Sequence, residues 1–262
     1  MAIEVFNRYE NKYLIDDTTC NRIQEKLFNY MEADRHSKQR GFYTISNIYF
    51  DTWDSSMIRN SLAKPKYKEK LRLRAYGVPK LDTKVYLEIK KKFNGLVNKR
   101  RTTLRLNEAY DFAINGIKPE FKDYMNKQVI NEIEYVLKLY HPEPKVYLAY
   151  DRKALLDKTN HDLRITFDTN IRTRRYDLRL EDGDYGEALI ESGLWLMEVK
   201  AEKSIPLWLS KVLSEYKVYH SSFSKYGKEY QKILLNNKQP KGEKEACLNQ
   251  FLPQRELIPQ YL

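Results

Sequence analysis

Lys70-Leu71-Arg72-Leu73-Arg74-Ala75 is the stretch that decides the fold, because charged and apolar residues alternate along it at period two. The cations occupy the even positions, and the apolar residues occupy the odd ones. Val85-Tyr86-Leu87-Glu88-Ile89-Lys90 repeats the alternation, with Glu88 and Lys90 on one face. Such alternation is typical of a half-buried β-strand. Both stretches are therefore predicted to be strands that have one charged face and one apolar face.

The same alternation recurs along the chain and predicts an antiparallel sheet. Polar positions of one parity are Arg8, Glu10 and Lys12; Arg164, Thr166 and Asp168; and Glu198 and Lys200. Residues 44–50 and 146–150 are also predicted to be strands, and Arg152 follows the second. A sheet of this kind can expose its charged face to water. It can also close with the charges inside, and the frequency of Arg, a bidentate phosphate ligand, favours the closed form.

Helices are predicted where apolar residues recur at helical spacing, and they would cover the aliphatic outer face of a closed sheet. The predicted helices run from Asp16 or Asp17 to about Asp34, over 107–115, from after Pro119 to before His141, from Ser204 or Pro206 to about Tyr216, and over about 225–236. No linker divides these segments, so residues 1–236 are predicted to form one domain. Residues 237–262 lack periodicity and are predicted to be a tail or packing arm.

Charge points to an anionic partner. The 262 residues include 47 Lys+Arg and 36 Asp+Glu, a net charge of +11. Residues 64–105 hold 15 cations and three acids, so this segment carries the whole excess. Such an excess suits nucleic acid, a membrane surface or a small polyanion. No Walker loop or dinucleotide glycine motif is present, which excludes the common phosphate-binding motifs.

The compartment is predicted from cysteine use and from apolar runs. Cys20 and Cys247 are too few for a disulfide scaffold or a cysteine-rich zinc module, and they fit a reducing compartment. No secretory signal is visible at the start of the chain, and no apolar run approaches the length of a membrane span. We therefore expect a soluble, cytoplasmic protein.

The charged faces together form a candidate site for phosphates. Its members are Arg8, Glu10, Lys12, Lys70, Arg72, Arg74, Glu88, Lys90, Lys99, Arg101, Arg152, Arg164, Glu198, Lys200 and Lys225. Cations predominate in this set, so it suits several phosphates, while the few carboxylates suit one or two Mg²⁺ or Mn²⁺ ions. Cations and metal would together neutralise the charge of a phosphoryl group during transfer.

Eight short motifs occur in the order seen in VTC domains, which the chain resembles over about residues 6–235. They are Arg-Tyr-Glu-Asn-Lys-Tyr (8–13), Ser-Asn-Ile-Tyr-Phe-Asp (46–51), Leu-Arg-Leu-Arg-Ala-Tyr-Gly (71–77), Leu-Glu-Ile-Lys (87–90), Tyr-Asp-Arg (150–152), Leu-Arg-Ile-Thr-Phe-Asp (163–168), Met-Glu-Val-Lys (197–200) and Phe-Ser-Lys-Tyr (223–226). VTC domains are the polyphosphate polymerase domains of the triphosphate tunnel metalloenzyme superfamily. The resemblance implies an α+β fold, a closed antiparallel β-tunnel of about eight strands with flanking helices.

The resemblance also implies an activity and a set of site residues. The family reaction moves the terminal phosphoryl group of ATP onto a growing polyphosphate chain, with Mn²⁺ or Mg²⁺. The implied phosphate contacts are Lys12, Arg72, Arg74, Lys90, Lys99, Arg152, Arg164, Ser224 and Lys225, to which the charged faces add Arg8 and Lys200. Arg72, Arg74, Lys90 and Glu198 are the expected catalytic set. Glu198 is the expected metal ligand, with Glu10 and Glu88 as further candidates.

The chain departs from the family in two respects. Ser222 stands where the yeast-type domain has a tunnel lysine, in a Lys-Phe-Ser-Lys motif, and Lys228 or His220 could compensate. The chain also shows no inositol-phosphate-sensing domain and no membrane segments, so transport of the polymer would need a separate membrane protein as partner.

Three other functions are weighed against the polymerase. A metal-dependent triphosphatase would pass the phosphoryl group to water, but hydrolytic relatives carry Glu-x-Glu-x-Lys on the first strand, where this chain has Arg8, Glu10 and Lys12. A non-catalytic polyphosphate-binding module fits the missing lysine. Nucleic-acid binding is disfavoured because the alternation hides the cations from an open surface.

Overall fold

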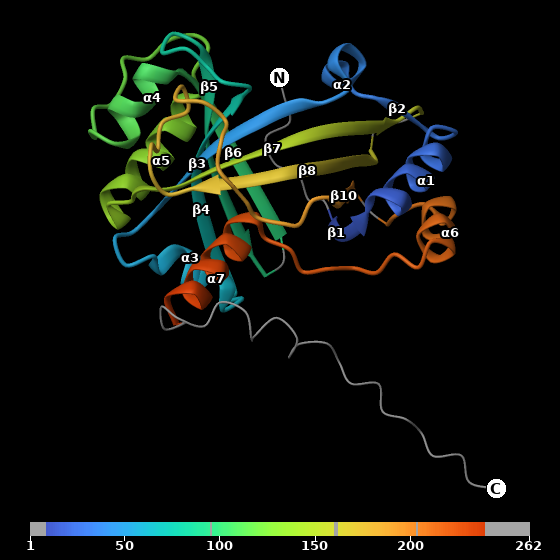
Figure 1. Ribbon diagram of the computed structural model, residues 1–262. Coiled ribbons are helices and arrows are strands. Elements are labelled where there is room, and N and C mark those ends of the chain that lie inside the picture. Colours follow the sequence, from blue (N-terminus) through green and yellow to red (C-terminus); the bar gives the residue numbers. More distant parts are fainter. Residues whose placement is uncertain (1–8, 95, 160–161, 203, 239–262) are drawn as a thin grey trace, which may run out of the picture.

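The computed structural model describes residues 9–94, 96–159, 162–202 and 204–238, which fold around one large antiparallel sheet (Figure 1). The strands in these ranges are β1 (Tyr9–Asp16), β2 (Met31–Ala33), β3 (Tyr43–Asp51), β4 (Tyr67–Tyr76), β5 (Lys84–Phe93), β6 (Leu96–Arg105), β7 (Glu143–Asp157), β8 (Arg164–Arg174), β9 (Glu187–Ala188) and β10 (Leu194–Ala201). The main path runs β1-β10-β8-β7-β3-β4-β5-β6, while β2 pairs with β7 and β9 with β8. Every pair is antiparallel, which confirms the predicted sheet.

Helices flank this sheet, so the fold class is α+β, as predicted. They are α1 (Asp17–Leu27), α2 (Arg35–Arg40), α3 (Ser56–Leu62), α4 (Leu106–Ala113), α5 (Lys127–Tyr140), α6 (Leu207–Glu215) and α7 (Lys225–Lys238). In Figure 1, α4 and α5 lie beside β4, β5 and β6, whereas α1 and α6 lie at the other end of the molecule. Among the described residues no helix combines the length and the apolar character needed to cross a membrane.

Two predicted helices are shorter than expected, for local reasons. Asp16 caps α1 through the amide of Thr19, as predicted, but the helix ends at Leu27. The chain then forms β2, whose Met31 pairs with Asp157 of β7, so tertiary pairing replaces the last helical turns. The helix expected after Pro119 begins only at Lys127, because the side chain of Asn126 caps it there.

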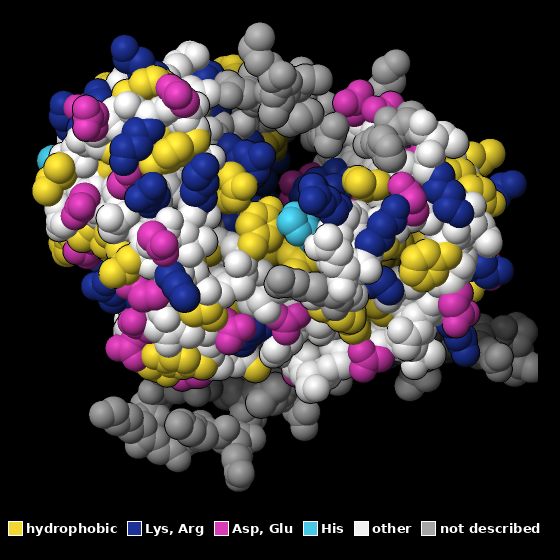
Figure 2. Space-filling view, turned by 90° about the horizontal axis from the view of Figure 1, so that it is seen from above, with side chains coloured by type: hydrophobic (Ala, Val, Ile, Leu, Met, Phe, Trp, Pro, Cys, Tyr) yellow, Lys and Arg dark blue, Asp and Glu magenta, His cyan; other side chains and the backbone are white. Residues whose placement is uncertain are grey.

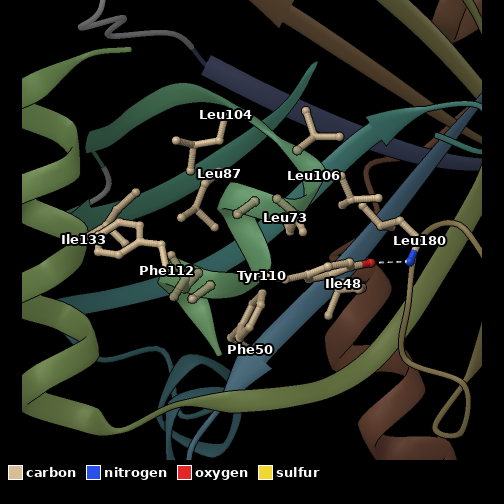
Figure 3. Packing of buried hydrophobic residues seen from close by; sticks show 14 of the residues in the cluster. Ile48, Phe50, Leu73, Leu87, Leu104, Leu106, Tyr110, Phe112, Ile133 and Leu180 are labelled. Carbon is tan, nitrogen blue, oxygen red and sulfur yellow. Dashed lines mark hydrogen bonds between the residues drawn. The ribbon is translucent and has the colours of Figure 1, made fainter. Parts of the chain in front are cut away.

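The alternation of the strands places apolar side chains outward, under the helices. Leu71, Leu73, Leu87 and Ile89 are fully buried in a cluster that includes residues of α4 and α5. Figure 3 shows Leu73, Leu87 and Leu104 packed with Phe112 of α4 and Ile133 of α5. Ile165 of β8 and Val199 of β10 pack in the same way against α1 and α6. The charged parity of each strand is therefore left on the concave face.

The open edge between β1 and β6 is bridged by side chains and by the segment that precedes α7, rather than by strand pairing. Within the described residues β1 and β6 are the ends of the main path and do not pair with each other, which corrects the expectation of a fully closed sheet. Lys90 Nζ of β5 instead lies 3.5 Å from Glu10 Oε2 of β1. The chain before α7 also binds β1, because the amide of Ser221 donates to the Lys12 carbonyl at 2.7 Å.

The first turn of α7 is fixed against the concave face by both apolar and polar contacts. Tyr226 packs in a buried cluster with Ile45, Tyr49 and Leu148. Its hydroxyl donates to Asp51 Oδ2 at 2.8 Å. The Asp51 carboxylate also accepts the amides that begin α3, so one buried group joins β3, α3 and α7.

We predict that Tyr226→Phe lowers the free energy of unfolding by about 1.5–3 kcal/mol, the usual net value of a hydrogen bond to a charged group. Urea unfolding followed by circular dichroism measures this change. Tyr135→Phe is the matched control, because Tyr135 is 65% exposed on α5 and should unfold as the wild type does. Equal stability of the two variants would contradict the anchoring role of Asp51.

Candidate functional site

The charged residues predicted from the alternation meet on the concave face of the sheet. The cations among them are Lys12, Lys70, Arg72, Arg74, Lys90, Lys99, Arg152, Arg164, Lys200 and Lys225, and the carboxylates are Glu10, Glu88, Asp168 and Glu198. Seen from above, the surface is hollowed at its centre, and Lys and Arg side chains lie in and around this hollow (Figure 2). We call this region the basic interior.

Glu88 of β5 contacts three cations on neighbouring strands of the basic interior. Its carboxylate lies 2.7 Å from Arg72 Nε and 2.5 Å from Lys99 Nζ, with Arg74 Nη1 at 3.8 Å. The side chain is only 1% exposed, and burial alone would raise its pKa. The three cations outweigh burial and hold the pKa of Glu88 well below its usual range. Glu88 is therefore an ionised counterion that holds three cations together.

Arg74 and Arg72 are also fixed by neutral partners. Arg74 Nε donates to Asn47 Oδ1 at 3.0 Å, and Arg74 Nη2 donates to the Tyr150 hydroxyl at 3.2 Å. Arg72 Nη1 donates to the Tyr49 hydroxyl at 3.2 Å. Burial would raise the pKa of Tyr49, but Arg72 and Arg74 lower it to about 8. The two guanidinium groups are thus held in place without any ligand.

A second buried cluster of ion pairs joins β7, β8, β10 and α7. Arg152 binds Asp168 in a bidentate manner, with Nε–Oδ1 at 2.6 Å and Nη2–Oδ2 at 2.7 Å. Lys225 Nζ lies 2.5 Å from Asp168 and 3.2 Å from Glu198. Burial raises the pKa of Asp168, but Arg152 and Lys225 more than offset it, so the pKa is lowered. The pKa of Glu198 is likewise well below its ordinary value, because Lys225 and Lys200 outweigh burial.

Glu10 and Glu198 lie close together on neighbouring strands. Lys12 Nζ is 3.2 Å from Glu10 Oε1 and 3.7 Å from Glu198 Oε1. Lys200 Nζ lies 3.2 Å from Glu198 Oε2. Burial would raise the pKa of Glu10, but Lys200 and Lys90 lower it to about 2. Two ionised carboxylates therefore face the basic interior from β1 and β10.

Lys70 is the cation least neutralised by these carboxylates. Among the described residues, Lys70 Nζ donates a hydrogen bond to Ser224 Oγ at 3.2 Å. Burial, with Lys90 and Lys12 nearby, lowers the pKa of Lys70 to about 8. Its ammonium group is thus available to an anion and becomes more highly charged as the pH falls.

Several predicted positions lie at the edge of the basic interior, on the surface or outside the described residues. Arg164 lies at the edge of the basic interior, 37% exposed, where its Nη2 is 3.1 Å from Asp34 Oδ2. Arg8 lies outside the described residues, as do residues 239–262 of the predicted tail. The two candidates to replace the missing lysine, Lys228 and His220, are both exposed.

Two residues were not assigned to the site from the sequence, although one of them, Asp168, was placed on the charged face of its strand. Asp168 shares its parity with Arg164, and this pattern could have identified it as a partner of Arg152. Asp34 caps α2 through the amide of Ser37, which is a recognisable sequence signal, but its contact with Arg164 depends on tertiary structure.

The chemistry of the basic interior suits a polyanion. In the described part of the chain these ten cations face four carboxylates, so an excess of positive charge remains to be balanced. At the edge, Asp34 pairs with Arg164, and a further predicted cation, Arg101, lies over the Tyr86 ring. No group of three or more His, Cys, Asp or Glu residues within the described ranges could hold a metal ion by itself. A divalent ion at Glu10 and Glu198 would thus need phosphate oxygens or water as further ligands, which is a usual arrangement for Mg²⁺.

Comparison with known proteins identifies the family and supports the fold. The family model of the VTC domain matches residues 7–234. An adenylate cyclase candidate from Bacillus halodurans is 14% identical, with a TM-score of 0.54, covering 85% of this chain and 96% of that chain. An adenylyl cyclase candidate from Hippeastrum with a dominant triphosphatase activity is 14% identical, with a TM-score of 0.47, covering 85% of this chain and 95% of that chain.

The PH1819 protein from Pyrococcus horikoshii is 12% identical, with a TM-score of 0.44, covering 87% of this chain and 99% of that chain. No curated protein matches this chain in sequence. The likeness to the Bacillus halodurans structure, at 14% identity, shows a shared fold.

We predict that Asp168→Asn lowers the free energy of unfolding by about 3–5 kcal/mol, because removing one partner of a buried ion pair leaves the other uncompensated. Here Arg152 and Lys225 would both lose their shared counterion. Chemical denaturation at pH 7 measures the loss. Glu143→Gln, at an exposed ion pair, is the control and should leave stability unchanged. A variant as stable as the control would show that Asp168 does not hold the basic interior together.

The lowered pKa of Asp168 also predicts that the stability of the protein depends on pH. The pKa of Asp168 is lowered on folding, so its contribution is present above its unfolded pKa and is lost as the pH falls through the folded pKa. The stability difference between wild type and Asp168→Asn should therefore shrink in acid, below about pH 4.

Proposed function

Since the chain belongs to the VTC domain family, we propose that it transfers the terminal phosphoryl group of ATP to a polyphosphate chain bound in the basic interior. The observation that carries the proposal is the excess of cations on the concave face over the carboxylates that hold them, which are Glu10, Glu88, Asp168 and Glu198, with Asp34 at the edge. A polyphosphate chain needs a continuous path of cations rather than one compact phosphate site, and the concave face supplies such a path. A cytoplasmic location fits the proposal, because ATP is the phosphoryl donor.

The spacing of cations along β4 supports a chain of phosphates. Lys70, Arg72 and Arg74 share one parity, so their Cα atoms follow one another at about 7 Å. Lys90 of β5 lies opposite Lys70 in the strand register, and Lys99 of β6 lies opposite Lys90. Neighbouring phosphates of one polymer can then bind successive cations, each in a charge-assisted contact.

We propose two roles for the cations: some fix the shape of the basic interior, and others stabilise charge on the transferred phosphoryl group. Arg152 and Lys225 share the fully buried Asp168, so they would chiefly set the shape and potential of the basic interior, while Lys99 would help to fix Glu88. Arg72, Arg74 and Lys90 would neutralise charge that develops on the transferred phosphoryl group. Lys12, Lys200 and Ser224 would contact phosphates nearer β1 and β10, with Arg164 at the edge.

Glu198 and Glu10 are the proposed metal ligands, because they lie close together and most of their contacts are lysines. Arg152 Nη2 also lies 3.9 Å from Glu198 Oε2. Glu88 suits this role less well than the sequence suggested, since it is 1% exposed and contacts Arg72, Arg74 and Lys99. A bound Mg²⁺ or Mn²⁺ would supply charge neutralisation on the donor phosphates. The lysines around Glu198 would then be free to turn toward phosphate.

Incubation with ATP and Mn²⁺ or Mg²⁺, followed by a gel stained for polyphosphate and an assay of orthophosphate, tests the proposal. Polymer on the gel is the expected result. Orthophosphate without polymer would contradict the polymerase and identify the triphosphatase. No turnover, with retained binding of polyphosphate, would leave the non-catalytic binding module.

We predict that Lys70→Met weakens binding of inorganic tripolyphosphate about tenfold or more, since a charge-assisted contact is worth about 1.5–3 kcal/mol. The wild-type affinity should also fall as the pH rises through about 8, the pKa of Lys70, because the ammonium loses its proton. Titration calorimetry at several pH values measures both effects. Lys138→Met, on the exposed side of α5, is the control for loss of a positive charge. Identical pH profiles for wild type and Lys70→Met would exclude Lys70 from the site.

We predict that Glu198→Gln lowers the rate of ATP turnover about 10²–10³-fold, the usual effect of losing a main electrostatic element. Tripolyphosphate binding in the absence of metal should persist, because the cations remain. Steady-state rates with each metal, together with calorimetry, separate the two effects. Glu187→Gln serves as the control, because the Glu187 side chain is 76% exposed and lies outside the proposed site. Turnover with unchanged metal dependence in Glu198→Gln would leave Glu10 as the metal ligand.

A further inference from the structure

Four aromatic rings gather at one end of the row of cations on β4. The rings of His36 and Tyr76 are stacked, with centroids 5.5 Å apart and planes at 17°. Tyr76 also meets Tyr43 at 6.0 Å and the edge of Tyr86 at 6.0 Å. Tyr43 is buried, but His36 is exposed and Tyr76 is 44% exposed. We call His36, Tyr43, Tyr76 and Tyr86 the aromatic cluster.

The strand register places the aromatic cluster on the concave side. Tyr76 follows Arg74 by two residues on β4 and so shares its parity. Tyr86 of β5 is the register partner of Arg74, and Tyr43 of β3 is the register partner of Arg152.

Two arginines lie next to the aromatic cluster. The Arg101 guanidinium lies 4.8 Å from the centre of the Tyr86 ring. The Tyr43 hydroxyl donates to Asp34, which also binds Arg164. Exposed rings beside arginines form a surface that suits a nucleotide, whose base stacks on the rings while its phosphates bind the cations.

We propose that the aromatic cluster is a stacking site for the base of the nucleoside triphosphate donor. This inference rests on the proposed function and adds an orientation to it. With the base at His36 and Tyr76, the phosphates would extend along β4 towards Arg74, Arg72 and Lys70. At the rise of a strand, the Cα atoms of Arg74 and Arg72 lie about 7 and 13 Å from that of Tyr76, a span comparable to an extended nucleoside triphosphate.

The orientation defines which end of the basic interior each substrate uses. The base would remain at the end marked by Tyr76, while the terminal phosphoryl group would lie deeper, towards Lys70, Lys90 and Glu10. The polyphosphate acceptor would then approach from the other end. Because every base has a stacking face, the site should accept different bases and should favour a nucleoside triphosphate over inorganic tripolyphosphate.

Paired titrations of ATP and inorganic tripolyphosphate test the aromatic cluster, with wild type, Tyr76→Ala, Tyr76→Phe and His36→Ala. We expect Tyr76→Ala to weaken ATP binding about tenfold and His36→Ala to weaken it several-fold, with the affinity for tripolyphosphate unchanged in both. Tyr76→Phe keeps the ring and should bind ATP as the wild type does. Tyr135→Ala, at an exposed tyrosine of α5, controls for loss of a surface ring.

The outcomes separate this inference from the proposed function. Unchanged ATP affinity in both Tyr76→Ala and His36→Ala, or an equal loss for both ligands, would overturn the stacking site while the polyanion site stood. Wild-type protein that binds neither ligand would overturn the proposed function itself. His36→Ala changes an exposed side chain, so it tests the site even if Tyr76→Ala disturbs the fold.

Discussion

The structure depends on the neutralisation of cations that the strand alternation forces onto one concave face. Ten lysines and arginines meet there, and their mutual repulsion opposes folding. Glu88 and Asp168, 1% and 0% exposed, each bind at least two of them. Ionised carboxylates at these positions hold the cations close together, at a cost in desolvation that only well-formed contacts offset. The carboxylates are too few to balance the charge, and this imbalance leaves the protein ready to bind an anion.

The segment from Ser221 to Tyr226 connects this electrostatic arrangement to the fold. It binds the backbone of β1, donates Lys225 to Asp168 and Glu198, and anchors Tyr226 on Asp51. Strand pairing does not join β1 to β6 in the described residues, so these contacts and the Glu10–Lys90 pair complete the enclosure. The same residues thus bridge the open edge and line the basic interior, so we expect changes in this segment to affect stability and anion binding together.

Much of the fold could be predicted because period-two alternation depends on local sequence alone. The opposite faces of Arg72 and Leu73, or of Glu88 and Leu87, follow directly from it. The end of α1 at Leu27 could not be predicted, since β2 forms only through pairing with β7. The open edge between β1 and β6, and the contact of Arg164 with Asp34, likewise depend on distant parts of the chain. Parity showed which carboxylates face inward, but not that Glu88 lies among three cations.

The most direct test of the claim that the cations of the concave face bind a polyanion is a structure of the protein with a polyanion bound. Crystals grown with inorganic tripolyphosphate should show its phosphates on the concave face, within hydrogen-bonding distance of Arg72, Arg74, Lys70 and Lys90. Glu88 and Asp168 should keep their contacts with Arg72 and Arg152. Tripolyphosphate bound on the outer surface, with the concave face unchanged and without phosphate, would contradict the account.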